Sequence, residues 1–513
     1  MGADVRTSRD VVEPMHGEHR LAGNSLGLSG VLFCIVTGAA PISAMMFNTP
    51  VAVLGVGWAA PATFLVATVA LTIFSIGYIE MAREVTAAGG FYSFVSHGFG
   101  QVMGMGTAIL IAACYTIFAA GVNGATTYFA KTTLADWTDG KVDLPVWLLL
   151  FGVLALYTGL AYFHIEVTSK ILGVFLVSEV IVLIIFFVAI LVQGGKDGLS
   201  LQPLNPLEIF SNSTGAASVF GATTVGVGLF GAFWSWVGFE MAPNYAEESK
   251  EPKKIMAPAT YISVIGLGIL YILVSWAYVM GVGRTDAPAK AVQSQFNGDI
   301  ANIYYPVAQD FGGTPLRVGF QLLIVTGSFA CSLAFYNTAS RYFYSMGRER
   351  LIPTVFGKVH PTHRSPYIAS FLVSIVCVAW TAGFYWYDQT ATGALFFLAT
   401  WSPLMGVLGI LLIQALVSFA IVVYFLKHGR PHPIKTIIAP LLGAAAMLFA
   451  SWLLFDNRTG ALGASSAPFV KYFPYAVIII FLLGCALALY YRASDKARYD
   501  AIGRFVHEDI PAA

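Results

Sequence analysis

Apolar residues form long runs along this chain, and short polar segments separate the runs. A helix needs about 20 apolar residues to cross about 30 Å of hydrocarbon. The runs that meet this length lie near 26–54, 58–79, 100–130, 144–163, 171–192, 216–239, 255–281, 316–340, 366–384, 403–426, 434–455 and 474–491. The pattern therefore predicts an all-α integral membrane protein with twelve transmembrane helices. A further apolar stretch, 391–401, is either a half-helix or a buried loop.

Lysine and arginine predict the orientation, because loops on the cytoplasmic side are enriched in both. With the N-terminus inside, 20 of the 28 Lys and Arg residues fall on inner segments. This excess predicts cytoplasmic tails at 1–25 and 492–513 and an even number of spans. No small-residue cleavage site follows the first apolar run, so we expect that run to remain as a span.

The composition agrees with a membrane protein and excludes two other classes. Hydrophobic residues make up 57% of the chain and charged residues 11%, and the formal net charge is +1. The near-neutral balance excludes a nucleic-acid partner, and the low charge excludes a disordered chain. The five cysteines fall inside predicted spans, where we expect no disulfide. No Cys/His spacing resembles a metal site, and the Gly-x-Gly-x-x-Gly match at 226–231 lies inside a span. We expect no cofactor.

The first span contains a helix-breaking sequence at its centre. Pro removes a backbone donor and clashes with the preceding turn, so the helix should unwind beside small residues and restart at Pro41. The residues of this predicted break are Thr37, Gly38, Ala39, Ala40, Pro41, Ile42 and Ser43. The alternative is a packed kink without a functional role.

The sixth span contains a second candidate break around Ser235, between several glycines and two tryptophans. Its candidate residues are Gly231, Ala232, Phe233, Trp234 and Ser235. Unpaired backbone is tolerated at membrane depth only where protein or a cavity covers it. A packed kink is again the alternative.

The positions of the two breaks, in the first and sixth helices, indicate an inverted repeat. An odd number of intervening helices reverses direction, so spans 1–5 (26–192) and 6–10 (216–426) can be inverted copies, followed by two further helices at 434–491. A half-helix N-terminus favours an anion, and freed carbonyls can accept from an ammonium group. The pattern therefore predicts a mid-membrane site for an amino acid or a related amine.

Glu179 is the acidic or basic residue that lies well away from the ends of the predicted spans. A mid-helix acid costs about 2.5–3.5 kcal/mol on insertion scales and usually faces the interior of a bundle. We interpret Glu179 as a proton carrier. A protonated structural acid and a sodium ligand are the alternatives.

Three segments resemble the amino acid–polyamine–organocation superfamily. They are 233–240 with 247–254, 337–341 with 344–353, and 81–83 with 89–92 and 98–100. The resemblance implies the LeuT-type 5+5 inverted repeat with two extra helices. It also implies that the first break binds the substrate carboxylate and that the carbonyls of Gly231 to Trp234 face the amine. It implies further that Trp234 is an occluding gate and that Glu240 senses protons.

Together these observations predict a secondary transporter of amino acids in the plasma membrane that works by alternating access. Proton-coupled symport is the favoured mechanism, with Na⁺ as the other possible coupling ion. An amine or polyamine permease and an amino acid exchanger are the alternatives. An enzyme would need at least two neighbouring buried reactive groups, and the spans offer one.

Overall fold

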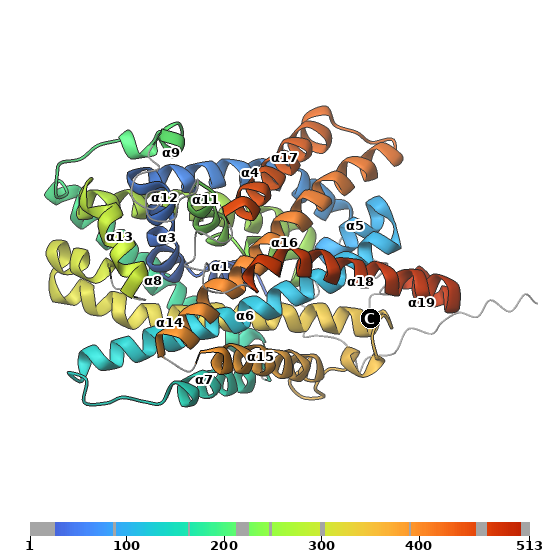
Figure 1. The fold of residues 1–513 in the computed structure, drawn as a ribbon. Helices are drawn as coiled ribbons and strands as arrows, with labels where there is room; N and C mark the ends of the chain where they lie inside the picture. The colour runs from blue at the N-terminus through green and yellow to red at the C-terminus, as the bar shows by residue number, and fades with distance from the viewer. Residues whose placement is uncertain are drawn as a thin grey trace, which may run out of the picture.

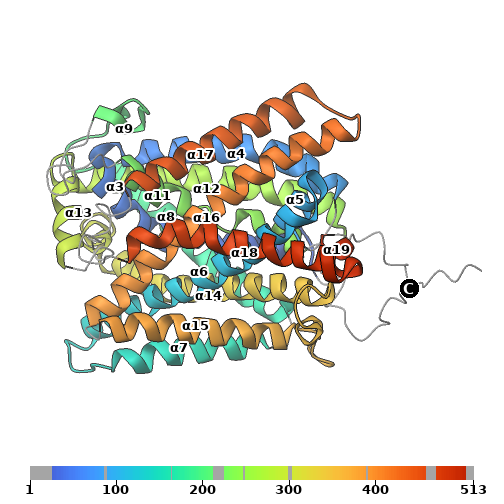
Figure 2. The ribbon, with the colours of Figure 1, turned by 45° about the vertical axis from the view of Figure 1, so that its right-hand side comes forward.

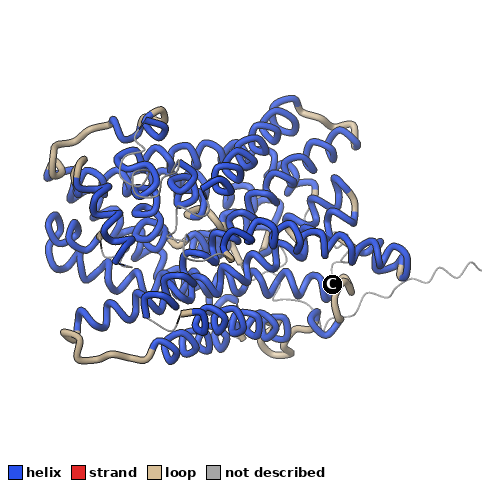
Figure 3. The backbone as a smooth tube through the Cα atoms, viewed as in Figure 1, coloured by secondary structure: helices blue, strands red, loops and turns tan. Residues whose placement is uncertain are grey.

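The computed structural model describes residues 26–85, 89–162, 165–211, 225–245, 249–297, 303–388, 391–457 and 469–503. Within these ranges the chain is almost entirely helical, as Figure 3 shows. An isolated bridge between Leu26 and Ser249 is the extended pairing found there. The predicted all-α class is therefore confirmed.

Long apolar helices account for the predicted spans. Among the described residues, ten helical runs are long and apolar enough to cross a membrane, and the first of these, Leu28–Glu84, covers the first two predicted spans. The shorter α7 covers the fourth, and residues 216–224 of the sixth lie outside the described residues. The main helices are α1 (Leu28–Ala39), α2 (Pro41–Ser43), α3 (Thr49–Val56), α4 (Ala60–Glu84), α6 (Gln101–Trp137), α7 (Val146–Ala161), α8 (Ile165–Gln193), α11 (Val225–Trp234), α12 (Pro252–Val282), α14 (Tyr304–Arg348), α15 (Tyr367–Tyr387), α16 (Ala391–Lys427), α17 (Ala439–Asn457) and α18 (Phe473–Ser494).

Several shorter elements connect the spans. They are α5 (Phe91–Phe99), α9 (Glu208–Ser211), α13 (Asp286–Asn297), α19 (Lys496–Ala501), the π-helical turns η1 (Ala44–Asn48) and η6 (Pro433–Ile438), and the 3₁₀ turns η2 (Gly57–Ala59), η3 (Gln202–Leu204), η4 (Phe239–Tyr245), η5 (Thr354–Gly357) and η8 (Val470–Tyr472). The stretch 391–401 is neither a separate half-helix nor a loop, because α16 runs continuously from Ala391 through Pro403.

The long helices lie side by side in several layers (Figures 1 and 2). In both views α6 and α14 run next to each other through the middle, with α7 and α15 beneath them and α4 and α17 above. Residues 26 and 503 lie at the same end of the helices, because both are tied to the end of α14. Leu26 pairs with Ser249, shortly after Tyr245, whose ring lies under the Arg341 guanidinium of α14. Gly503 donates to Glu349, directly after α14. We call this end the termini face and the other end the opposite face.

Side-chain burial distinguishes the interior helices from those at the periphery. Every residue of η1, α3 and α11 is buried, and so are the last three residues of α1, Thr37 to Ala39. On α18, by contrast, Ile478, Ile479, Leu482 and Leu483 are each more than half exposed. A face of exposed aliphatic side chains on a helix whose backbone is internally hydrogen-bonded suits contact with lipid. The five cysteines are buried and have free thiols.

Candidate functional site

The first predicted break is present at Ala40. This residue adopts a left-handed conformation, with φ 41° and ψ 75°, and its N–H donates back to Val36 and Thr37, which ends α1. Pro41 then begins the next helical segment, where its missing N–H and fixed φ cost nothing. The break is therefore a change of direction imposed by one αL residue and one proline.

Two carbonyls freed by this break accept hydrogen bonds from neighbouring helices. The Sγ of Cys331 in α14 donates to Gly38 O at 3.1 Å. The hydroxyl of Tyr271 in α12 donates to Ala39 O at 3.0 Å. Buried carbonyls need such partners, since an unsatisfied one costs about 1–3 kcal/mol. The Cys331 thiol and the Tyr271 hydroxyl satisfy both carbonyls.

The second break lies at 235–238, where α11 ends after Trp234 and Gly238 has φ 121°. Residues 231–234 remain helical, and the carbonyls of this segment already accept hydrogen bonds from the N–H groups of the next turn. The N–H of Ser235 bonds Gly231 and Ala232, that of Trp236 bonds Phe233, and that of Val237 bonds Trp234. The unwound backbone thus begins one residue beyond the carbonyls named from the sequence.

The two breaks lie against each other. A Cβ at Gly238 would come within 3.0 Å of Ala39 N, so glycine permits the contact between the two main chains. Asn48 Nδ2 donates to Ser235 Oγ at 2.9 Å, and this hydroxyl donates to Gly231 O at 2.9 Å. The breaks therefore form one structural unit at the centre of the bundle.

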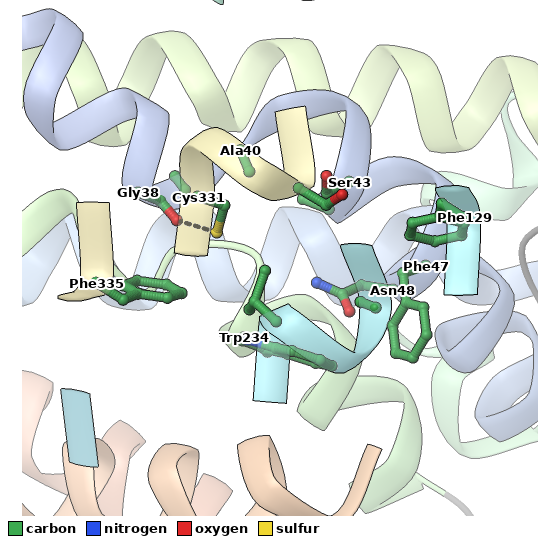
Figure 4. A pocket seen from close by; sticks show the side chains of 14 residues that line it. Gly38, Ala40, Ser43, Phe47, Asn48, Phe129, Trp234, Cys331 and Phe335 are labelled. Carbon is green, nitrogen blue, oxygen red and sulfur yellow. Dashed lines mark hydrogen bonds between the residues drawn. The ribbon is translucent and has the colours of Figure 1, made fainter. Parts of the chain in front are cut away.

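A cavity of about 400 Å³, including its mouth, opens beside this unit (Figure 4). Its walls come from both broken helices and from α6 and α14. Its lining residues are Gly38, Ala39, Ala40, Ser43, Ala44, Phe47, Asn48, Val122, Ala125, Phe129, Trp234, Ser328, Cys331 and Phe335. None of these residues is charged, and the buried oxygens Ser43 Oγ and Asn48 Oδ1 have no hydrogen-bond partner within the described part of the chain.

The cavity includes some of the sequence-predicted residues and excludes others. Gly38, Ala39, Ala40, Ser43 and Trp234 line it. The remaining predicted residues lie outside its lining, and they are Thr37, Pro41, Ile42, Gly231, Ala232, Phe233 and Ser235.

The sequence analysis took its binding residues from the two breaks, so it did not include the lining residues of α6 and α14. Val122, Ala125 and Phe129 follow i, i+3, i+7 spacing, as do Ser328, Cys331 and Phe335. Such a stripe marks one face of a helix. This spacing could have indicated the two cavity walls, but the same spacing occurs wherever a helix face packs against other helices.

Trp234 lies at the floor of the cavity and is held by two phenylalanines. Its ring stacks on Phe230 at 5.6 Å between centroids and meets Phe47 edge-on at 5.4 Å. Phe47 also lines the cavity, so aromatic contacts join the two broken helices there.

Glu179 lies behind the first break and not in the cavity lining. Its side chain is 1% exposed, and its Oε2 accepts the N–H of Ile42 at 3.2 Å. A Cβ on Gly327 of α14 would come within 2.5 Å of Oε1, so the carboxylate is enclosed between α8, α14 and the broken helix. The carboxylate therefore caps the N-terminus of the helical segment that starts at Pro41.

Glu240 lies in η4, two residues after Gly238 of the second break. Its Oε1 accepts the hydroxyl of Tyr115 at 2.8 Å, and its Oε2 accepts the N–H of Gly238 at 3.0 Å. The hydroxyl of Tyr78 donates to the Glu240 carbonyl at 2.8 Å. This residue links the second break to α4 and α6.

Comparison with known proteins gives the family of this chain. The sequence profile described as "Amino acid permease" matches residues 27–484, which is most of the chain. The chain belongs to the amino acid permease family. It is a multi-pass membrane transporter, not an enzyme, and the resemblance to the amino acid–polyamine–organocation superfamily is confirmed.

The names of its relatives indicate that they carry different substrates. The chain is 22% identical to the branched-chain amino acid permease BcaP of Bacillus subtilis, over 77% of this chain and 80% of the relative. It is 24% identical to the glutamate/serine transporter AimA of the same organism, over 87% and 78%. It is 22% identical to the low-affinity putrescine importer PlaP of Escherichia coli, over 62% and 66%.

Two contacts join neighbouring segments of the permease near the termini face. The N–H of Lys250 donates to Leu26 O at 2.9 Å, and the Arg341 guanidinium lies over the Tyr245 ring at 4.6 Å. Arg83 pairs with Glu80, and Arg430 with Glu84, on the surface at the end of α4.

Proposed function

We propose that this permease transports neutral amino acids with apolar side chains across the plasma membrane, in symport with protons. The observation that carries the proposal is an uncharged cavity bounded by two adjacent helix breaks. The 5+5 repeat and the cytoplasmic placement of the termini face are parts of the same proposal. The inner location of 20 of the 28 Lys and Arg residues supports that placement.

The cavity wall favours a neutral side chain on the substrate. Burying an unpaired charge at membrane depth costs several kcal/mol, and no charged residue lines the described cavity to compensate a lysine, glutamate or polyamine. Val122, Ala125 and Phe129 present hydrocarbon to the substrate. This argument disfavours the amine and polyamine alternative.

Main-chain groups of the first break and the Ser43 hydroxyl can bind the zwitterionic head group of the substrate. The free hydroxyl of Ser43 and the N-terminal end of the 41–56 helical segment suit the carboxylate. An ammonium group can replace the Cys331 thiol at Gly38 O and the Tyr271 hydroxyl at Ala39 O. Both replacements exchange a weak or neutral donor for a charged one, which strengthens the hydrogen bond.

Glu179 couples this binding to a proton. When it is ionised, its carboxylate caps the same helix N-terminus toward which the substrate carboxylate is drawn. Two like charges near one low-dielectric site repel each other, and protonation of one removes the repulsion. Proton and amino acid therefore bind together, which is the thermodynamic requirement of symport.

Uptake into proteoliposomes tests the function. A panel of leucine, valine, alanine, glutamate, lysine and putrescine is compared under an imposed pH gradient, an imposed Na⁺ gradient, and neither. We expect accumulation of the neutral amino acids driven by the pH gradient. Uptake confined to lysine or putrescine would contradict the substrate class, and accumulation driven by Na⁺ alone would contradict proton coupling.

The variant Glu179→Gln isolates the coupling role. Gln keeps the shape and an oxygen acceptor for Ile42 N–H but cannot ionise. We expect amino acid binding and exchange to persist while gradient-driven accumulation is lost. Ser178→Ala, at a partly exposed position of α8, is the matched control and should accumulate substrate like the unmodified protein. Full accumulation by Glu179→Gln would refute the coupling role.

A further inference from the structure

Residues 502 and 503, which follow α19, are buried at the termini face. Ile502 is 1% exposed and belongs to the hydrophobic core, although α19 itself contains no buried residue. At the end of α18, the Tyr491 hydroxyl donates to Leu351 O at 2.8 Å. The chain thus leaves α18, passes through a helix with no buried residue and returns into the protein at residues 502 and 503.

Gly503 connects two elements through its main chain. Its N–H donates to Oε2 of Glu349, directly after α14, at 3.1 Å. Its carbonyl oxygen accepts the Ser93 hydroxyl of α5 at 3.3 Å. Glu349 also accepts the hydroxyl of Tyr92, the neighbour of Ser93, at 2.9 Å. The four residues therefore close a ring of hydrogen bonds between α5 and the end of α14.

The geometry of this contact requires a glycine at position 503. Gly503 has φ 72°, a left-handed conformation that other residues rarely adopt. A Cβ would come within 2.5 Å of both Cβ and Oγ of Ser96 on α5. The Ser96 hydroxyl is itself bonded to Tyr92 O at 2.8 Å. A larger residue at 503 would therefore push this segment away from α5.

The two elements that Gly503 connects belong to different walls of the central cavity. The Phe94 ring of α5 lies 5.5 Å from the Tyr78 ring of α4, and the Tyr78 hydroxyl donates to Glu240 O, just after the second break. On the other side, α14 contributes Cys331 to the cavity lining. The Gly503 contact therefore joins the elements behind the second break to the helix that carries Cys331.

We propose that residues 502 and 503 form a latch that holds α5 against the end of α14 and so opposes opening of the central cavity toward the termini face. The proposal rests on the proposed function, in which this face opens to the cytoplasm. Gly503 is then a positioning residue of the transport cycle. Loss of one hydrogen bond to a carboxylate changes an equilibrium constant by about 10-fold or more. The latch therefore shifts the balance between two arrangements and does not prevent either.

The rate at which Cys331 reacts with a membrane-impermeant methanethiosulfonate tests the latch. The reagent is added to inside-out vesicles, which present the termini face, and to right-side-out vesicles, and mass spectrometry quantifies the adduct on each cysteine. In Gly503→Val we expect modification of Cys331 from the termini face to accelerate by about 10-fold, without acceleration from the opposite face. Ser93→Ala removes one neutral hydrogen bond and should accelerate it by about 3-fold.

Gly429→Val is the matched control for the substitution at Gly503. Gly429 also has a left-handed φ, of 66°, but no atom lies within 4 Å of the place of an added Cβ. It follows the end of α16, where Lys427 Nζ donates to Gly98 O of α5 at 2.9 Å. The control thus strains the backbone near α5 without displacing the latch, and we expect an unchanged rate.

The outcomes separate the latch from the proposed function. An unchanged rate in both Gly503→Val and Ser93→Ala would overturn the latch. Equal acceleration at Cys331 and at the other four cysteines, which are also buried, would overturn it too, because general loosening of the fold would be the cause. The uptake of leucine by the unmodified protein is measured separately, so pH-driven uptake together with either result would leave the transporter function standing.

Discussion

At the scale of single residues, Cys331 offers a direct probe of the central cavity. It is the cysteine that lines the cavity, while the other four are buried between helices. We expect a small membrane-permeant thiol reagent to modify Cys331 and to block uptake, since the adduct fills the space beside Gly38. A substrate amino acid in excess should protect the thiol from modification.

The measurement is the rate of loss of uptake with the reagent, with and without leucine. Cys331→Ala provides the control, because it should transport and resist the reagent. It also removes the thiol donor to Gly38 O, so a modest change in KM is expected. Modification of Cys331 that proceeds at the same rate with saturating leucine would argue against the cavity as the substrate site.

We expect Glu349 to give the termini face a dependence on pH. It follows α14, is 3% exposed, and accepts the Tyr92 hydroxyl at 2.9 Å and the Gly503 N–H at 3.1 Å. Burial raises the pKa of its carboxyl from 4.5 to about 7, although these two donors and the Arg348 guanidinium act in the opposite direction. Release of the 502–503 segment would return the carboxyl to water.

The sign of the effect follows from the raised pKa of Glu349 in the closed arrangement, in which Gly503 is bound to its carboxylate. The closed arrangement binds the proton more tightly than the released one. Its stability is therefore greatest below pH 4.5, falls between about pH 4.5 and 7, and is constant above. The free energy of opening should fall by about 1.4 kcal/mol per pH unit in that window. Hydrogen exchange of the Gly503 amide, corrected for its intrinsic rate, measures this opening. Glu349→Gln should abolish the pH dependence, and protection that increases with pH would contradict the assignment.

At the scale of helices, glycines determine how closely α11 packs. A Cβ at Gly226 would lie 2.3 Å from the Leu453 carbonyl oxygen of α17, which is backbone and cannot rotate away. Gly226→Ala should therefore push the two helices apart and destabilise the protein by about 1–3 kcal/mol. Thermal unfolding in detergent should show a lower Tm.

Gly266 of α12 is the matched control for this substitution. It is a helical glycine with no atom within 4 Å of the place that an added methyl group would take, so its replacement meets open space. Gly266→Ala should leave Tm unchanged or raise it, since alanine is favoured over glycine in helices by about 1 kcal/mol. An equal fall in Tm for both variants would mean that helix packing at Gly226 is not the cause.

The elements could be predicted where hydrophobicity alone determines them. Apolar run length located the spans, and Pro41 located the first break, because both depend on local physics. The amphipathic α5 and the helical segment 304–312 before Gly313 were missed, since short helices at an interface have no long apolar run. The continuity of α16 across Pro403 was missed as well, because neighbouring helices decide whether a proline ends a helix.

At the scale of the whole molecule, the cavity could be predicted only in part. Local sequence indicated the lining residues Gly38, Ala39, Ala40, Ser43 and Trp234, since breaks are local events. The walls from α6 and α14 depend on which faces of distant helices meet. The capping of Ile42 by Glu179 joins residues 137 positions apart, so the sequence identified the buried acid but not its partner.

The alternating-access mechanism predicted from the sequence can be tested at the termini face as a whole. Leu26 and Ser249 form a bridge there, which joins the segment before α1 to the segment after η4. Opening the cavity toward this face requires the two segments to separate. Paired main chains lie about 5 Å apart, a distance that a disulfide can span. The double variant Leu26→Cys, Ser249→Cys should therefore be locked closed on oxidation.

We expect the oxidised double variant to bind leucine from the opposite face but to lose uptake, and a reductant should restore uptake. Binding persists because the disulfide closes the termini face without touching the cavity, whereas transport needs that face to open. The two single variants should transport under both conditions, because the five native cysteines are buried. Uptake at the unmodified rate by a fully cross-linked protein would show that substrate leaves by a path that does not separate Leu26 from Ser249.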